Sequence, residues 1–356
     1  MVGILMAAAL ALVIGLIGTP VAIRVFRARE LGQLIQADLP DSHQTKRGTP
    51  TMGGVVMVLG AVTGYIAVHN TLTGVEFSRA GIMVVGTMVG LGLVGFLDDW
   101  LKIRNHRSLG LTKTAKFAGQ AACAGGLALG AWYWAGAWRG LSFIRPIGGT
   151  ELFLILFIAW VFIIVAGASN AVNLTDGMDG LASGSTVLVM SAYVVIAFWQ
   201  FRHSCAAEPL NSVGCYMIDT SEAHDIAVAA SAMMGACAGF LWWNAPPARI
   251  FMGDTGSLAL GGMLAAIALF TDTQFLLFVL GGLYVIETLS VILQIASFRL
   301  LHRRVFRMAP LHLHFELQDW PETTVIVRFC ILAGLAVAFG LGLFYAEFLA
   351  QGGSGG

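Results

Sequence analysis

Long apolar segments recur along the whole of this chain, and they restrict its fold more than any other feature. A helix needs about 20 mostly apolar residues to cross the hydrocarbon core of a bilayer. Segments of that kind lie at residues 3–23, 52–68, 80–97, 117–138, 152–170, 181–201, 225–243, 257–271, 275–298 and 325–349. Charged residues make up only 11% of the chain, whereas soluble domains contain roughly 25%. The sequence therefore predicts an all-α, polytopic integral membrane protein with about ten transmembrane helices.

The apolar segments leave no room for a separate soluble domain, so we expect residues 1–350 to form a single transmembrane domain. The first segment lacks a basic leader and a small-residue cleavage site, which predicts a first span and not a removable signal. Residues 351–356 end in GGSGG and are interpreted as a linker or tag remnant. Segment 257–271 is short enough to be a re-entrant loop, which would reverse the orientation of every later segment.

The basic residues distinguish between these two topologies. With ten crossings and the N-terminus outside, sixteen of the twenty Lys and Arg residues lie in inside loops. Cytoplasmic loops of membrane proteins carry an excess of Lys and Arg. A re-entrant segment 257–271 would move the basic cluster between Arg299 and Arg307 outside and largely cancel this bias. We therefore predict ten full crossings, with the inside loops in the cytoplasm.

Polar sequence motifs gather on the same inside surface. The inside loops carry SHQTKRGTPTMGG, FLDDWLK, NAVNLTDGMDGL, NAPPARIFMGDTGS and MAPLHLHFELQD, and the outside loops carry nothing comparable. The five cysteines show no CxxC pair or other metal-ligand spacing, so a zinc site is not expected. Cys205 and Cys215 share an outside loop, where they either form a disulfide or stay unpaired.

Asp98 and Asp99 are adjacent carboxylates at the inner end of an apolar span. A charge at such a place is costly unless water, a cation or a partner receives it. Two together indicate a metal ligand or a base, and the alternative is a pair that only caps the helix at the water interface. Asp254, in FMGDTGS before the eighth segment, either belongs to the same site or is a helix N-cap.

Asn173, Asp176 and Asp179 recur at a spacing of three residues, with glycines between them. On a helical turn they would project from neighbouring positions on one side. Carboxylate and amide oxygens without cysteine suit Mg²⁺ better than zinc, and Mg²⁺ is usually bound by one or two carboxylates together with substrate phosphates. The pattern therefore indicates Mg²⁺-dependent phosphoryl chemistry.

Lysines on the inside surface can hold phosphate oxygens, although a positive-inside topology alone would also place lysines there. These residues are Lys46, Lys102, Lys113 and Lys116. The sequence contains no GxxxxGK[ST] loop, which excludes a P-loop ATPase.

His312 and His314 lie between Pro310 and Pro321, in an inside loop with short helical content. Residues two apart do not share a helix face, so an HExxH-like zinc site is excluded. A loop can still turn both imidazoles toward a substrate.

Four motifs, GTPTMGG, FLDDWLK, NAVNLTDGMDGL and FMGDTGSLALGG, follow one another on the inside surface. Together they resemble the phospho-N-acetylmuramoyl-pentapeptide transferase family, within the polyprenyl-phosphate N-acetylhexosamine-1-phosphate transferases, over nearly the whole chain. The resemblance implies transfer of phospho-MurNAc-pentapeptide from its UDP conjugate to undecaprenyl phosphate, which gives lipid I and UMP in the first membrane step of peptidoglycan synthesis. It also implies Mg²⁺ as cofactor, a bacterial cytoplasmic membrane location, no nucleic-acid partner and, as a family expectation, a homodimer.

The resemblance assigns roles by motif position. Asp98, Asp99, Asp254 and His312 match the family's catalytic residues, with Asp254 as its metal-binding aspartate. The substrate-binding positions are the lysines Lys46, Lys102 and Lys116, the nucleotide-side residues Asn173, Asp176 and Asp179, the uridine-pocket residues Asn244 and Phe251, and Gln294 and His314. The family commonly shows three consecutive histidines, whereas Leu313 replaces the middle one here. Any role that needs an imidazole at that position is therefore in doubt, and His314 can cover part of it.

Two mechanisms and two other functions stay open at this point. The lipid phosphate attacks directly, with Asp98 as its base or orienting group, or a carboxylate of Asp98 or Asp254 first forms a covalent phospho-sugar. A sister transferase would move phospho-GlcNAc instead, although TPTMGG and HxHFE favour the muramoyl branch. An ion-coupled transporter would use Glu287 in the ninth segment, but transporters place polar sites near the midplane and here most acidic motif residues lie at inner loop edges.

Overall fold

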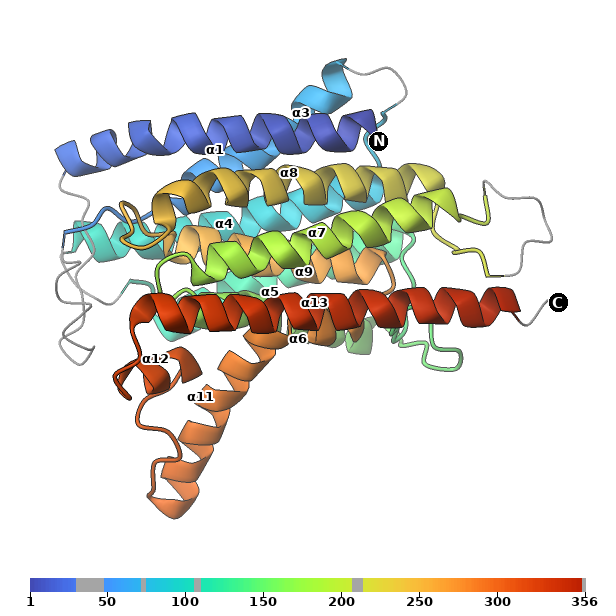
Figure 1. Ribbon diagram of the computed structural model, residues 1–356. Helices are drawn as coiled ribbons and strands as arrows, with labels where there is room; N and C mark the ends of the chain where they lie inside the picture. The colour runs from blue at the N-terminus through green and yellow to red at the C-terminus, as the bar shows by residue number, and fades with distance from the viewer. Residues whose placement is uncertain (30–47, 72–74, 106–109, 207–213, 354–356) are drawn as a thin grey trace.

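The computed structural model describes residues 1–29, 48–71, 75–105, 110–206 and 214–353, which form a bundle of helices (Figure 1). The long helices are α1 (Val2–Ala28), α3 (Gly54–Thr71), α4 (Arg79–Arg104), α5 (Lys113–Gly130), α6 (Leu154–Thr175), α7 (Leu181–Arg202), α8 (Thr220–Asn244), α9 (Gly253–Phe270), α11 (Gly282–Leu301) and α13 (Glu322–Gly353). The short ones are the π-helical η1 (Ala131–Ala135), α10 (Leu276–Leu280) and α12 (Leu311–Glu316). The described residues form no strand beyond two isolated bridges, so the all-α prediction is confirmed.

The number of crossings agrees with the prediction of about ten. Nine helices in the described chain are long and apolar enough to span a membrane, namely α1, α3, α4, α6, α7, α8, α9, α11 and α13. The fourth predicted span is occupied by α5 and η1, and α5 is less apolar because its first turn carries two lysines. The start of α1 and the end of α13 lie at the same end of the bundle, which requires an even number of crossings (Figure 1).

Helix α9 lies inside the bundle, packed against α4 and α6, and 94% of its apolar window is buried. It runs without a break from Gly253 to Phe270, a length of about 27 Å at 1.5 Å per residue. Small residues allow this packing, because a Cβ at Gly261 would lie only 2.4 Å from the carbonyl oxygen of Ala168 on α6. The eighth predicted segment is therefore one continuous helix and not a re-entrant pair.

The ninth predicted span, residues 275–298, is broken in the structure. Gly281 adopts φ −88° and ψ 25°, which ends α10 and lets α11 leave the bundle at an angle (Figure 1). Only 22% of the apolar window of α11 is buried. The apolar composition continues across the break, so the hydropathy pattern alone predicted one straight helix.

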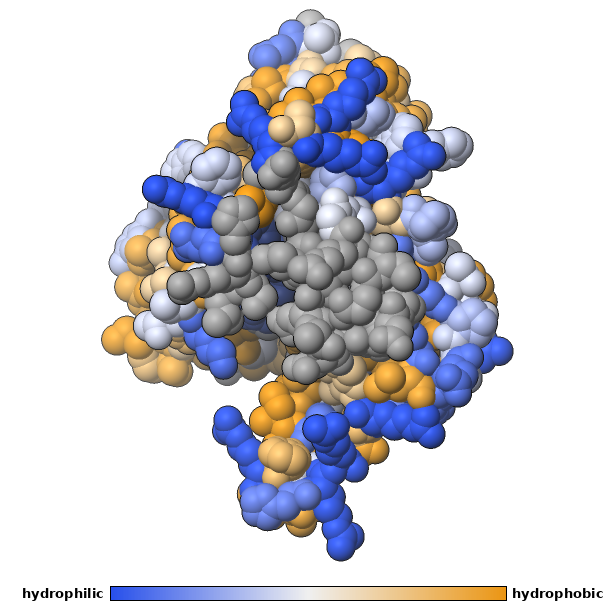
Figure 2. Space-filling model, turned by 90° about the vertical axis from the view of Figure 1, so that its left-hand side faces the viewer, coloured by the Kyte–Doolittle hydropathy of each residue, from blue (hydrophilic) through white to orange (hydrophobic). Residues whose placement is uncertain are grey.

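The described parts of the predicted inside loops lie at one end of the bundle, which we call the inner end. It holds the C-terminal ends of α4, α6 and α8 and the N-terminal ends of α5, α9 and α13 (Figure 1). Figure 2 shows hydrophilic side chains at this face around the ends of α1 and α11. The exposed basic residues there include Arg24, Arg27, Arg29, Arg299, Arg303, Arg304 and Arg307.

The opposite end, which we call the outer end, carries a disulfide between Cys205 and Cys215. The alternative of two unpaired thiols is therefore wrong. Arg145 fastens the disulfide loop to α13, because its guanidinium donates to the carbonyl of Cys215 at 2.6 Å and to the carboxylate of Glu347 at 2.7 Å.

Candidate active site

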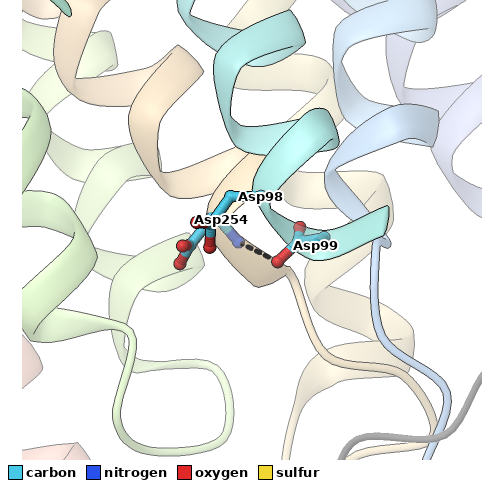
Figure 3. Close-up of side chains that lie close together, drawn as sticks. All are labelled: Asp98, Asp99 and Asp254. Carbon is cyan, nitrogen blue, oxygen red and sulfur yellow. Dashed lines mark hydrogen bonds between the residues drawn. The ribbon is translucent and has the colours of Figure 1, made fainter. Parts of the chain in front are cut away.

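Helix ends meet at the inner end and bring the polar motifs of separate loops together (Figure 3). Asp98 and Asp99 lie near the C-terminus of α4, and Asp254 lies in the first turn of α9. Close packing is possible because a Cβ at Gly95 would lie 2.1 Å from the carbonyl oxygen of Asp254. A Cβ at Gly54, on α3, would likewise lie 2.1 Å from a backbone nitrogen of α9. The motif glycines thus permit α3 and α4 to contact the start of α9.

The aspartates form one acidic cluster. Asp98, Asp99 and Asp254 each offer a carboxylate oxygen, and these oxygens lie within 4.8 Å of one another. Asp98 and Asp99 are each only 3% exposed. Carboxylates this close repel one another strongly unless cations or hydrogen-bond donors face them, so the surrounding side chains decide whether the cluster can exist.

Two of the predicted lysines supply that positive charge. The ammonium of Lys102 lies 2.6 Å from Asp98 Oδ2 and 2.9 Å from Asp254 Oδ2. The ammonium of Lys116 lies 2.7 Å from the same oxygen of Asp254. Their side chains are 31% and 21% exposed, so both ammonium groups can also reach an anion that arrives from solvent. Lys113 is exposed at the start of α5, and Lys46 lies outside the described residues.

Asp98 accepts the backbone N–H of Leu111 at 2.8 Å through the carboxylate oxygen that does not face Lys102. The loop before α5 is thereby tied to the end of α4, and Lys116 follows one turn into α5. Asp98 therefore has one carboxylate oxygen in a structural contact and one toward the lysine that borders the cluster.

Asp99 caps the N-terminus of α9 from outside that helix. Its Oδ1 accepts the backbone N–H of Asp254 at 3.1 Å (Figure 3), and its Oδ2 accepts the backbone N–H and the hydroxyl of Thr255 at 2.9 and 2.8 Å. The first N–H groups of a helix have no partner within it and carry partial positive charge, so a carboxylate stabilises them. Asp99 therefore caps α9 and not its own helix α4, and it does so as a member of the acidic cluster.

Asp254 does not cap α9, so the N-cap alternative for this residue is wrong. The N-cap position is Met252, which makes no side-chain cap bond. The Asp254 carboxylate instead turns to the lysines and accepts a hydrogen bond from Asn173 Nδ2 at 2.6 Å. The same amide lies 2.8 Å from the hydroxyl of Ser257, so Asn173 joins the end of α6 to the acidic cluster.

The segment after α6 does not continue as a helix. α6 ends at Thr175, and residues 176–180, which we call the nucleotide-side loop, lead into α7. The Oδ2 of Asp179 accepts the backbone N–H of Ala248 at 2.9 Å. The expectation that Asn173, Asp176 and Asp179 share one side of a helical turn is therefore wrong, because the helix ends before the second of them.

Asp176, in the nucleotide-side loop, interacts electrostatically with the acidic cluster. Burial raises the pKa of Asp176, and the charges of Asp254, Asp99 and Asp179 raise it further. A backbone hydrogen bond from Gly253 lowers it in part, which also connects the loop to the start of α9. This carboxyl group therefore holds its proton to a higher pH than an ordinary aspartate does.

Asn244 and Phe251, the predicted uridine-pocket residues, both form hydrogen bonds that connect neighbouring loops. Asn244 is 2% exposed, accepts hydrogen bonds from the backbone of Gly180 and the hydroxyl of Ser183, and donates to the carbonyl of Ile250 at 2.9 Å. The backbone of Phe251 pairs with the 50–53 loop. The structure thus gives Asn244 a structural role within the protein, and only part of Phe251 is exposed.

His312 lies in the short helix α12 and is fully buried. Its Nδ1 lies 3.1 Å from Oε1 of Glu287, whose other oxygen accepts the backbone N–H of Leu311 at 2.7 Å. On its other side the ring abuts Gly177, where a Cβ would lie 2.3 Å from Nε2. His312 therefore packs between α11 and the nucleotide-side loop and does not touch the acidic cluster directly.

His314 and Gln294, two further predicted binding residues, hold the loop between α11 and α12. His314 Nδ1 accepts the backbone N–H of Arg307 at 3.0 Å, on a different side of α12 from His312. Gln294 donates to the carbonyl of Phe306 at 3.0 Å. Leu313 is 5% exposed, so the position where the family commonly has histidine is here a buried apolar one.

Sequence reasoning missed Thr255 and Ser257 and did not find a partner for Glu287. Thr255 and Ser257 stand in the FMGDTGS motif beside Asp254, and their contacts depend on how α4 and α6 meet α9. A signal for Glu287 was present, because an intramembrane carboxylate requires a polar partner and His312 lies in the inside loop that follows the same apolar segment.

Comparison with known proteins agrees with the site. The pattern of glycosyl transferase family 4 matches residues 81–272, and a phospho-N-acetylmuramoyl-pentapeptide-transferase signature matches residues 46–58. The phospho-N-acetylmuramoyl-pentapeptide-transferase of Frankia casuarinae is 56% identical and that of Saccharopolyspora erythraea 50%, with 99% and 98% of each chain covered. The enzyme of that name from Mycolicibacterium paratuberculosis is 49% identical over 98% of both chains. The chain therefore belongs to the phospho-N-acetylmuramoyl-pentapeptide-transferase family.

Proposed function

We propose that the protein transfers phospho-MurNAc-pentapeptide from its UDP conjugate to undecaprenyl phosphate, with lipid I and UMP as products. The observation that carries this proposal is the inner-end cluster, where Lys102 and Lys116 meet three carboxylates beside the nucleotide-side loop. Such a cluster suits a reaction that exchanges one phosphoanhydride for another, in which positioning and charge neutralisation supply most of the catalysis. The names of the relatives give the same transferred group and reaction class.

Mg²⁺ is the proposed cofactor, and the residues present fit it. The acidic cluster offers three hard oxygen ligands and includes neither cysteine nor histidine. Asp254 would hold the ion, with Asp98 as the second candidate, because Asp99 already uses both oxygens to cap α9. When bound, Mg²⁺ supplies positive charge to the diphosphate oxygens of the donor.

The lysines have the most direct proposed role. Lys102 and Lys116 now neutralise Asp254, and an arriving diphosphate would offer their ammonium groups new oxygens. Asp98 borders the same space and would orient the attacking phosphate of the lipid. A phosphate monoester has a second pKa of about 6 and is already largely ionised at neutral pH, so a base adds little and orientation is the larger effect.

We further propose that the inner end faces the cytoplasm of a bacterial cell and that residues 1–350 act as one catalytic domain in the cytoplasmic membrane. Two features at opposite ends of the bundle support this orientation. The inner end carries most of the basic residues, and the outer end carries the disulfide between Cys205 and Cys215. Cytoplasmic loops are enriched in Lys and Arg, and disulfides persist on the oxidising side of a membrane.

Turnover by the purified full chain tests the function. UMP release and the lipid product are measured with undecaprenyl phosphate and Mg²⁺, with UDP-MurNAc-pentapeptide and UDP-GlcNAc as alternative donors. We expect turnover with the muramoyl donor only. Turnover with UDP-GlcNAc alone would identify the sister transferase, and no UMP release from either donor would overturn the transferase assignment.

Matched lysine variants on one helix test the role of the cluster. Lys116→Gln removes a cation 2.7 Å from Asp254 and should lower kcat/KM by about 10- to 100-fold, since a charge-assisted contact to phosphate contributes about 1.5–3 kcal/mol. Lys113→Gln, one turn earlier and exposed, should stay near wild type. Equal losses in both variants would show that general surface charge, and not this contact, matters.

Isotope exchange separates direct attack from the covalent route. Labelled UMP is incubated with UDP-MurNAc-pentapeptide and enzyme that is free of lipid phosphate. We expect no exchange, because the lipid phosphate must attack before UMP leaves. Robust exchange would establish the covalent route through Asp98 or Asp254.

A further inference from the structure

Glu287 is a carboxylate in the middle of the chain's ninth apolar segment, and it is completely buried. Neither of its oxygens faces the acidic cluster or a cation in the described residues. Its Oε2 accepts the backbone N–H of Leu311, and its Oε1 lies 3.1 Å from Nδ1 of His312. Both carboxylate oxygens of Glu287 therefore contact α12, one at its backbone and one at the imidazole of His312.

The contact with Glu287 decides how the His312 ring presents its two nitrogens. A carboxylate can only accept, so the ring nitrogen that faces it carries a proton. In the neutral ring the other nitrogen, Nε2, is then an acceptor. Nε2 is buried and has no hydrogen-bond partner among the described residues. Nδ1 and Glu287 Oε1 form no aligned hydrogen bond either, but they lie 3.1 Å apart, which leaves Nδ1 as the nitrogen that faces the carboxylate.

The free nitrogen is directed at the nucleotide-side loop. Gly177 lies directly over it, with space too small for any side chain, because a Cβ would stand 2.3 Å from Nε2 and 2.8 Å from Cε1. Gly177 itself is exposed, so the loop backbone separates the imidazole from solvent. The neighbouring residue Asp176 reaches the start of α9, which carries Asp254.

We propose that Glu287 is a positioning residue for the transfer reaction. It holds the Nδ1 proton of His312 so that the Nε2 acceptor faces the nucleotide-side loop, where it accepts a hydrogen bond when the nucleotide-sugar donor is bound. A buried acceptor without a partner is unfavourable in the free enzyme, and the donor-bound loop removes that cost. This inference rests on the proposed function, since it assigns the nucleotide-side loop to donor binding.

Glu287→Gln tests the role of the carboxylate with little change in volume. If the amide oxygen keeps the N–H of Leu311, the amide NH₂ faces Nδ1 and donates to it, which moves the ring proton to Nε2. The acceptor at the loop is then lost. We expect kcat/KM for the UDP donor to fall by about 10- to 100-fold, the range seen when a group that orients a functional imidazole is removed.

Ser290→Ala is the matched control. Ser290 is also buried on α11, one turn from Glu287, and its hydroxyl bonds only to the backbone carbonyl of Glu287 at 2.7 Å. We expect near-wild-type turnover from it. Gly177→Ala approaches the same imidazole from the exposed loop without removing a buried group, and it should lower kcat/KM in the same direction as Glu287→Gln.

Nitrogen-15 NMR of histidine-labelled full-length protein gives a readout that loss of packing would not change. The His312 signals are assigned by their absence in His312→Asn. We expect the proton on Nδ1 in wild type and on Nε2 in Glu287→Gln, with unfolding midpoints that stay close. A proton on Nε2 in wild type would overturn the proposal, and so would Glu287→Gln turnover within twofold of wild type.

The two hypotheses fail in distinguishable ways. An inactive wild-type enzyme with the muramoyl donor contradicts the proposed function and leaves the tautomer measurement to decide whether Glu287 orients His312. An active wild-type enzyme with no effect of Glu287→Gln or Gly177→Ala contradicts only the positioning role.

Discussion

Replacement of Asp99 by alanine should destabilise the protein as well as reduce its activity, because this carboxylate holds the start of α9. Three donors lose their acceptor at once, namely the backbone N–H groups of Asp254 and Thr255 and the hydroxyl of Thr255. Each such hydrogen bond contributes about 0.5–1.5 kcal/mol net, so the free energy of unfolding should fall by roughly 2–4 kcal/mol. The residue is 3% exposed, which limits replacement of these bonds by water.

Two finer variants divide this effect. Asp99→Asn keeps one acceptor oxygen, which can serve both groups of Thr255, and loses the bond to the N–H of Asp254, for a loss of about 1 kcal/mol. Thr255→Val removes only the hydroxyl bond and should lose a similar amount. Asp99→Asn should nevertheless reduce turnover more, because it releases the backbone of the metal-binding candidate Asp254.

Thermal unfolding in detergent, followed with a thiol-reactive dye, is the assay. Cys237 is buried and free, so its reaction with the dye reports loss of the bundle. At about 2 °C per kcal/mol, Asp99→Ala should lower the midpoint by several degrees and the two finer variants by about 2 °C each. A midpoint for Asp99→Ala within 1 °C of wild type would refute the capping argument, and Asp99 would then act only in the chemistry.

Three further predictions follow from the site and the loops. Asp254→Asn should abolish turnover and remove any rise in unfolding midpoint on addition of Mg²⁺, and wild-type behaviour would refute the metal assignment. Burial raises the pKa of Asp272 from 3.8 to about 7, so folding stability should fall as pH rises between these values. Asp272→Asn should remove that pH dependence of the midpoint. After reduction, a membrane-impermeant maleimide should label Cys205 from the periplasmic or outer side of intact cells, and labelling only after cell lysis would reverse the proposed orientation.

Hydropathy and charge placement predicted most of the fold, because both reflect the bilayer and not the neighbours of a helix. Nine of the predicted spans appear as apolar helices, and α5 with η1 occupies the tenth. The break at Gly281 was missed, because the apolar composition continues on both sides of it and predicts one helix. Its position depends on how α11 leaves the bundle, which a one-dimensional pattern does not contain.

The sequence predicted which residues form the site better than it predicted the contacts that they make. Sidedness alone placed Asp98, Asp99 and Asp254 on one surface, and the structure brings them within one cluster. The sequence did not show that Asp254 faces the lysines while Asp99 caps α9. These contacts depend on where the end of α4 meets the start of α9. Likewise, Asp179 was grouped with Asp176 by spacing, but α6 ends at Thr175 and sends them to different partners.

The charge balance of the cluster gives a reason for an order of binding. Three carboxylates face two lysines, so the cluster carries a net charge of minus one when all five groups are ionised. A diphosphate that approached this site alone would meet net repulsion, whereas a divalent cation would be attracted. A cation held there would leave Lys102 and Lys116 free to turn from Asp254 to phosphate oxygens. The donor should therefore bind weakly in the absence of Mg²⁺, and a donor affinity that is independent of the metal would contradict this order.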